Sequence, residues 1–170
     1  MSQDITLRET EQRDLPAAAI VIERANAERD SLSFVDPILV ESTLEKLSPK
    51  LQRPGAWSTV ALYEEEVAGI ILGYPADVAG DLPEAYSDAE YISLLMVDPL
   101  HWGKGIAGSL IEVIAKKAAA NKKDQIVLLT RESDNDHARG MYEHKGFCLT
   151  GDIRQSKYGK QVLYLLNLNS

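Results

Sequence analysis

The chain has 170 residues, of which 45% are hydrophobic and 26% are charged, and its formal net charge at pH 7 is −8. This size and composition are typical of one globular domain, which we expect to span residues 1–170. The negative charge disfavours a nucleic-acid partner, whose phosphates it would repel. No apolar run approaches the roughly 20 residues of a membrane helix, so we expect no membrane partner. The beginning lacks a signal-peptide pattern and the chain has one cysteine, which together favour a cytoplasmic location.

In the first half of the chain, turn residues and hydrophobic periodicity predict alternating strands and helices. We expect a short strand at 5–8, a helix from about 15 to 29 after Asp14, and a second helix at about 37–47. A loop at 48–55 precedes two strands, 57–63 and 67–73, joined by an acidic turn at 64–66. Residues 75–89 show no periodicity, and we expect them to form a long loop.

The second half predicts a strand at 91–97, a helix at 104–121, a strand at 125–130 and a helix at 135–144. Strands at 147–150 and 157–168 close the chain. We see no internal repeat and no linker that would divide the chain. One mixed α/β (or α+β) domain therefore fits best.

The most informative segment follows the strand at 91–97 and reads Val97-Asp98-Pro99-Leu100-His101-Trp102-Gly103-Lys104-Gly105-Ile106-Ala107-Gly108. Glycine lets the backbone approach a ligand closely, and a helix start offers unpaired N–H groups and the positive end of the helix dipole. This combination suits a phosphate or pyrophosphate, although a plain tight turn would have the same glycines. A Rossmann-type nucleotide site is a weaker alternative because no acidic residue ends a second strand about 20 residues later.

A second segment follows the strand at 125–130 and contains Asn135, Ala138, Tyr142 and Gly146-Phe147. Together the two segments resemble the GNAT superfamily of N-acetyltransferases. That family has an (Arg/Gln)-x-x-Gly-x-(Gly/Ala) turn after a strand ending in Val-x-Pro, and a later helix with Asn-x-x-Ala-x-x-x-Tyr that ends at Gly-Phe. The resemblance implies a central mixed sheet of about six to seven strands flanked by about four helices.

The resemblance also implies that the protein moves an acetyl group from acetyl-CoA to a primary amine by direct attack in a ternary complex. The acceptor would be a small-molecule amine or a peptide amino terminus, and the protein a monomer or homodimer. We expect no metal, because His101, His137 and His144 lack the companions of a metal site. A catalytically silent CoA-binding module of the same fold is the alternative, because the motifs do not include a general base.

Acetyl-CoA would be held mainly by backbone groups. The resemblance assigns the pyrophosphate to the turn residues Gly103, Lys104, Gly105, Ile106, Ala107 and Gly108, and the pantetheine arm to the backbone of Leu95, Met96 and Val97. Trp102 departs from the Arg or Gln of the family motif, which leaves a side-chain contact to phosphate in doubt. Asn135 is an N-cap candidate by its own chemistry, and the resemblance adds a contact to the CoA arm.

Tyr142 is the strongest catalytic candidate, because a phenol can donate a proton to the leaving thiolate. In relatives, a glutamate that acts as the general base occupies one of two positions, and in this sequence those positions hold Tyr91 and Thr130. The remaining candidates for the base are Glu90, Glu84, Asp88, or a water relayed by Ser93 and Tyr91. Among the carboxylates Glu90 comes first, but strand alternation would place it on the face opposite Tyr91, so we favour the relay. We expect Cys148 to be a small buried residue at a strand start rather than a nucleophile.

Overall fold

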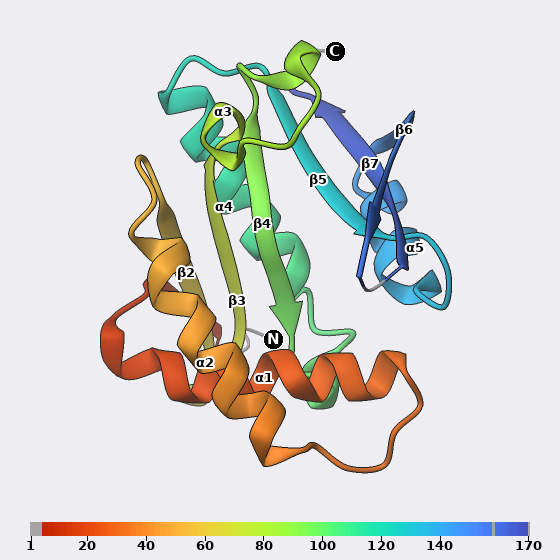
Figure 1. The fold of residues 1–170 in the computed structure, drawn as a ribbon. Helices are drawn as coiled ribbons and strands as arrows, with labels where there is room; N and C mark the ends of the chain where they lie inside the picture. Colours follow the sequence, from red (N-terminus) through yellow and green to blue (C-terminus); the bar gives the residue numbers. More distant parts are fainter. Residues whose placement is uncertain (1–4, 158, 170) are drawn as a thin grey trace. The chain divides into compact units, whose positions relative to one another are not determined.

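The computed structural model describes residues 5–157 and 159–169 (Figure 1). Its strands are β1 (Ile5–Glu9), β2 (Trp57–Tyr63), β3 (Glu66–Pro75), β4 (Glu90–Val97), β5 (Gln125–Arg131), β6 (Cys148–Ser156) and β7 (Gly159–Asn167). The α-helices are α1 (Leu15–Arg29), α2 (Pro37–Leu51), α3 (Ala76–Ala79), α4 (Ile106–Ala120) and α5 (Asp136–His144), and the 3-10 helices are η1 (Gln12–Asp14), η2 (Glu84–Tyr86) and η3 (Pro99–His101). The strands pair in the order β1-β2-β3-β4-β5-β7-β6. The predicted mixed α/β fold is confirmed.

Within this fold the backbone contacts define two compact units. The first unit comprises Met1–Gly73 and Leu94–Val113, and the second comprises Tyr74–Ser93 and Ile114–Ser170. Strand β4 and helix α4 each contribute residues to both units. The single domain over residues 1–170 stays a prediction. Among the described residues, no helix is both long and apolar enough to cross a membrane.

In the first unit, β1, β2 and β3 pair antiparallel, from Ile5 opposite Tyr63 to Trp57 opposite Gly73. Helices α1 and α2 share a buried apolar core with β2 and β3, formed by Leu15, Ala18, Ala19, Ile22, Leu47, Val60 and Ile70. A two-bond ion pair supports the start of α1, because Arg8 donates to both carboxylate oxygens of Asp14 at 2.7 and 2.8 Å. The Arg8 guanidinium holds the pKa of Asp14 below its ordinary value.

Helix α2 is four residues longer than the sequence predicts. Its start follows the expected rules, since the Asp36 side chain accepts a hydrogen bond from the Ile38 N–H and Pro37 occupies the first turn. It continues through Pro49 to Leu51, because a proline near the end removes a single N–H and the bond from Gln52 N to Ser48 O extends the ladder past it.

In the second unit, β4 and β5 are parallel, from Glu90 opposite Ile126 to Ile92 opposite Leu128. Strand β7 lies antiparallel between β5 and β6. Strand β6 continues to Ser156 instead of ending near residue 150, because a register shift between Leu149 and Ile153, with Gly151 at φ +94°, lets the strand continue past this point.

Two further expectations in this unit are wrong in part. The predicted loop at 75–89 contains α3 and η2, which are too short to produce a periodic sequence pattern. Cys148 is exposed, because it begins β6, which is last in the strand order.

Candidate active site

The glycine turn lies in the first unit between the end of β4 at Val97 and the start of α4 at Ile106. Gly103 and Gly105 have φ angles of +83° and +82°, which side chains rarely tolerate. A Cβ atom added at either glycine would have no described atom within 4 Å, so both face open space. The N–H of Ser109 bonds to the carbonyl of Gly105 at 3.0 Å, which begins the helical ladder. The N–H groups of Ile106, Ala107 and Gly108 therefore precede the ladder and suit an anion.

Asp98, directly after β4, holds the beginning of this turn in place. The residue is 3% exposed, and its carboxylate accepts hydrogen bonds from the Leu100 N–H at 3.1 Å and from Arg24 Nη1 on α1 at 2.8 Å. Its own N–H donates to the carbonyl of Ala68 on β3 at 2.8 Å. One side chain thus joins the turn to α1 and caps η3. Sequence reasoning missed this role, because Arg24 lies 74 residues away from Asp98.

Gly69 on β3 is a second residue that sequence reasoning missed. A Cβ atom there would lie 3.0 Å from the Ile106 side chain and 3.2 Å from the carbonyl of Met96. Glycine lets β3 approach the start of α4 and the end of β4 this closely without either neighbour having to shift. An isolated glycine inside an apolar strand was the available signal.

Trp102 and Lys104, the other two polar side chains next to the glycines, also have partners. The indole N–H of Trp102 donates to the carbonyl of Val97 at 3.0 Å. The ammonium of Lys104 lies 4.6 Å from the centre of the Tyr63 ring and 3.2 Å from Nδ1 of His101. Lys104 is therefore oriented toward the end of β2, and its predicted contact with a phosphate stays a prediction. Leu95 and Met96 are partly buried on β4 ahead of the turn.

In the second unit, Asn135 lies between β5 and α5 and is 8% exposed. It occupies the N-cap position of α5, but its side chain makes no capping hydrogen bond, so that part of the expectation is wrong. Its amide nitrogen donates instead to Thr130 Oγ1 at 2.8 Å and to the Arg131 carbonyl at 2.9 Å. Asn135 thus ties the beginning of α5 to the end of β5.

Tyr142 lies on α5 within an aromatic cluster and is 7% exposed. Its ring centre lies 5.7 Å from that of Phe147, edge to face, and 6.1 Å from that of Tyr164. Burial, and to a smaller extent the nearby Tyr91, raises the pKa of Tyr142 above its ordinary value of 10.0. The phenol therefore keeps its proton at neutral pH.

Tyr164 in the same cluster has a different environment. Its hydroxyl donates to Glu143 Oε2 at 2.7 Å and accepts from Arg139 Nε at 2.8 Å. This hydroxyl is engaged in a charged network, which distinguishes it from Tyr142.

Glu90 begins β4 and is completely buried. The pairing of β4 with β5 is continuous from Glu90 to Ile92, so Glu90 and Tyr91 lie on opposite faces, as strand alternation predicts. The ring centre of Tyr91 lies 5.5 Å from that of Tyr74, whose hydroxyl donates to Ser93 Oγ at 3.4 Å. The two residues of the predicted relay therefore have a common neighbour, Tyr74: Tyr91 contacts its ring and Ser93 accepts from its hydroxyl. Glu84 and Asp88 are exposed.

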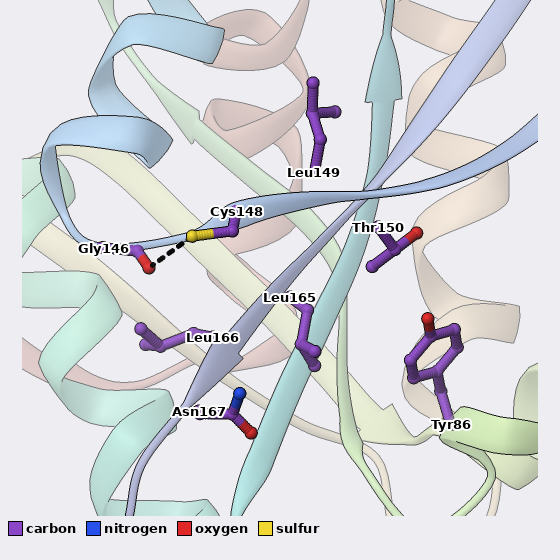
Figure 2. A pocket seen from close by; sticks show the side chains of 8 residues that line it. All are labelled: Tyr86, Gly146, Cys148, Leu149, Thr150, Leu165, Leu166 and Asn167. Carbon is purple, nitrogen blue, oxygen red and sulfur yellow. Dashed lines mark hydrogen bonds between the residues drawn. The ribbon is translucent and has the colours of Figure 1, made fainter. Parts of the chain in front are cut away.

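The second unit has a pocket of about 430 Å³, lined by Tyr86, Gly146, Cys148, Leu149, Thr150, Leu165, Leu166 and Asn167, whose side chains are drawn in Figure 2. The Cys148 thiol points to the carbonyl of Gly146 at 3.8 Å. None of the predicted site residues lines this pocket. Within residues 5–157 and 159–169, no group of three or more His, Cys, Asp or Glu side chains could hold a metal ion.

The model of the acetyltransferase (GNAT) family matches residues 24–147, which include the glycine turn and the Asn135–Tyr142 segment. The chain belongs to this family. The resemblance read from the two motifs is thereby confirmed. The search of curated proteins found no significant match to this GNAT chain.

Solved GNAT structures share its fold at low sequence identity. The PaiA N-acetyltransferase from Thermoplasma acidophilum, in complex with coenzyme A, is 16% identical with a TM-score of 0.71, covering 98% of this chain and 99% of its own. The ribosomal-protein-S18-alanine N-acetyltransferase from Escherichia coli is 19% identical with a TM-score of 0.69, over 96% of this chain and 94% of its own. An aminoglycoside 6'-acetyltransferase type Ii is 15% identical with a TM-score of 0.71, over 96% of this chain and 97% of its own.

Proposed function

We propose that this protein is an acetyl-CoA-dependent N-acetyltransferase that acetylates a primary amine by direct attack in a ternary complex. The observation that carries this function is the open turn at Gly103 and Gly105 before the start of α4, in a chain of the acetyltransferase (GNAT) family. We further propose a cytoplasmic protein that acts as a monomer or homodimer without a metal.

The N–H groups of Ile106, Ala107 and Gly108 would hold the pyrophosphate of acetyl-CoA, with Gly103 and Gly105 leaving room for it. The positive end of the α4 dipole adds to this attraction. Lys104 would supply further positive charge. Backbone groups of Leu95, Met96 and Val97 would bind the pantetheine arm in the manner of an added strand, and Asn135 would contact the same arm.

In the reaction, the neutral amine attacks the thioester carbonyl carbon, the C–N bond forms, and the C–S bond breaks. Tyr142 would donate a hydrogen bond and then a proton to the leaving thiolate. A phenol is a weaker acid than a thiol even at its ordinary pKa, and burial raises the pKa of Tyr142 further. Tyr142 would therefore act first as a hydrogen-bond donor that stabilises the thiolate, and the proton would follow as CoA leaves.

The attacking amine must lose a proton, and we propose that a water relayed by Ser93 and Tyr91 accepts it. The burial of Glu90 on the face opposite Tyr91 supports the relay over direct action by Glu90. Under this mechanism the rate rises with pH toward the pKa of the acceptor. Amines with a low pKa are the better acceptors near pH 7.

The named relatives support an amine as acceptor. By their names, one acts on the alanine of a ribosomal protein and another on an aminoglycoside. We propose a small-molecule amine or a peptide amino terminus for this chain.

Steady-state turnover of acetyl-CoA with a panel of amines and short peptides tests the function, with calorimetry of CoA binding alongside. Binding together with amine-dependent release of CoA supports the enzyme. Binding without turnover across the panel supports the alternative, a silent CoA-binding module. That alternative is favoured by Tyr91 and Thr130 at the two usual glutamate positions. The absence of CoA binding would contradict both functions.

A further inference from the structure

Trp102 occupies the position where the family motif has Arg or Gln. An Arg or Gln side chain offers flexible polar donors, whereas the indole of Trp102 offers one N–H. In this structure that N–H is directed back to the chain and bonds to the carbonyl of Val97, at 3.0 Å. The bond spans five residues and closes the turn at the end of β4. The departure from the motif therefore replaces a potential ligand contact with a contact inside the turn.

We propose that Trp102 is a positioning residue for acetyl-CoA, whose indole hydrogen bond to Val97 sets the glycine turn in its binding shape before the ligand arrives. This inference rests on the proposed function. The glycines that give the turn its open form also make it flexible, since glycine has more conformational freedom than any other residue. If only a fraction of the molecules has the turn in its binding shape, the apparent Kd of the ligand is the intrinsic Kd divided by that fraction. A flexible turn therefore weakens binding.

A second side chain, Asp98, also holds the turn. The Asp98 carboxylate, 3% exposed, accepts from the Leu100 N–H and from Arg24 and so secures the first part of the turn. The Trp102 indole secures the part that leads into Gly103. Between them the two side chains hold the chain from Val97 to Trp102, and the glycines follow directly.

The direct test is Trp102→Phe, which removes the N–H and keeps an aromatic ring. We expect the Kd of CoA and the KM of acetyl-CoA to rise about fivefold, the effect of one lost hydrogen bond. The kcat at saturating acetyl-CoA and the KM of the acceptor should stay within about twofold, because a preorganised turn acts on binding alone. Trp57→Phe is the matched control, since Trp57 is the other tryptophan of the chain and lies on β2. It should leave the Kd of CoA unchanged.

A second substitution separates the hydrogen bond from ring packing. In the Trp57→Phe background, biosynthetic replacement of tryptophan by its sulfur isostere β-(3-benzothienyl)alanine keeps the bicyclic ring of residue 102 and removes the N–H. We expect the same fivefold loss of CoA affinity. In the ligand-free Trp57→Phe protein, the remaining indole proton should exchange slowly with solvent by NMR, which shows that the bond precedes binding.

The outcomes are distinct. Unchanged CoA affinity in either the Trp102→Phe or the isostere protein overturns the inference, as does fast exchange of the indole proton without ligand. A loss confined to kcat also overturns it. If the wild-type protein itself binds no CoA, the proposed function fails instead, and the two failures are distinguished by the wild-type titration.

Discussion

The glycine turn of the first unit and the Asn135–Tyr142 segment of the second serve the proposed reaction in different ways. In the turn, the proposed binding groups are backbone N–H groups, and the side chains of Asp98 and Trp102 bond to the chain itself. In the second segment the proposed roles belong to side chains, and burial raises the pKa of the most important one, Tyr142. Under this proposal a backbone site would accept Trp in place of Arg or Gln, whereas a side-chain site would have no substitute for its hydroxyl.

The largest effect should come from the side-chain region. We expect Tyr142→Phe to lower kcat about 10²-fold, the low end of general-acid effects, and to leave the affinity for acetyl-CoA nearly unchanged. Steady-state kinetics with saturating acetyl-CoA measures this. The control is Tyr164→Phe. It also removes a hydroxyl from the aromatic cluster, but this hydroxyl bonds to Glu143 and Arg139 and has no proposed role in the reaction. It should cost about 1 kcal/mol of stability and little turnover. Full turnover in a folded Tyr142→Phe protein would assign Tyr142 to packing.

The backbone region should respond in binding rather than in turnover. Gly105→Val places a branched side chain at φ +82° and fills the open space where the pyrophosphate would lie. We expect CoA affinity to fall at least tenfold, or about 1.4 kcal/mol, by calorimetry. Gly80→Val is the matched control, because Gly80 has φ +84° and equally open surroundings but lies outside the turn. Loss of affinity in both variants, or in neither, would contradict the assignment of the pyrophosphate to this turn.

A smaller effect is expected at Glu90, despite its complete burial. If the base is a relayed water, Glu90→Gln should reduce the rate less than tenfold between pH 6 and 9, and the rise of rate with pH should follow the acceptor's pKa. If Glu90 is the direct base, Glu90→Gln should lower the rate 10²- to 10⁴-fold at neutral pH and change the lower limb of the pH profile. A loss above 10²-fold in a folded protein would overturn the relay.

The effect that is smallest at neutral pH concerns stability, because it develops only at alkaline pH. The pKa of Tyr142 is raised above 10.0 in the folded protein, so its contribution to stability is complete below pH 10 and is lost as pH rises toward the folded pKa. From this residue we expect the free energy of unfolding to fall by at most about 1.4 kcal/mol per pH unit above about pH 10. Urea titrations of wild type and Tyr142→Phe at several alkaline pH values measure the difference. Equal slopes would show that Tyr142 is not buried as a neutral phenol.

The sequence by itself predicted the family, and it predicted the strands and helices next to the site. Strand 91–97, the helix after the glycines and the helix at 135–144 lie within two residues of β4, α4 and α5. Hydrophobic periodicity and glycine are local signals that act over a few residues, and the spacing within each motif is likewise local. The positive φ angles of Gly103 and Gly105 agree with the same reasoning.

Tertiary structure alone decided which partners the site residues choose. Asn135 was expected to cap α5, but its amide nitrogen donates to Thr130 and Arg131 on β5; these partners are only five and four residues away, and the conformation of the β5–α5 junction decides between them and the helix N–H groups. Asp98 pairs with Arg24 on α1, and the exposure of Cys148 follows from the edge position of β6. The raised pKa of Tyr142 depends on burial within the folded chain. These features depend on contacts between residues that the fold brings together, and no local pattern of residue types encodes which of the available partners lies within hydrogen-bond distance.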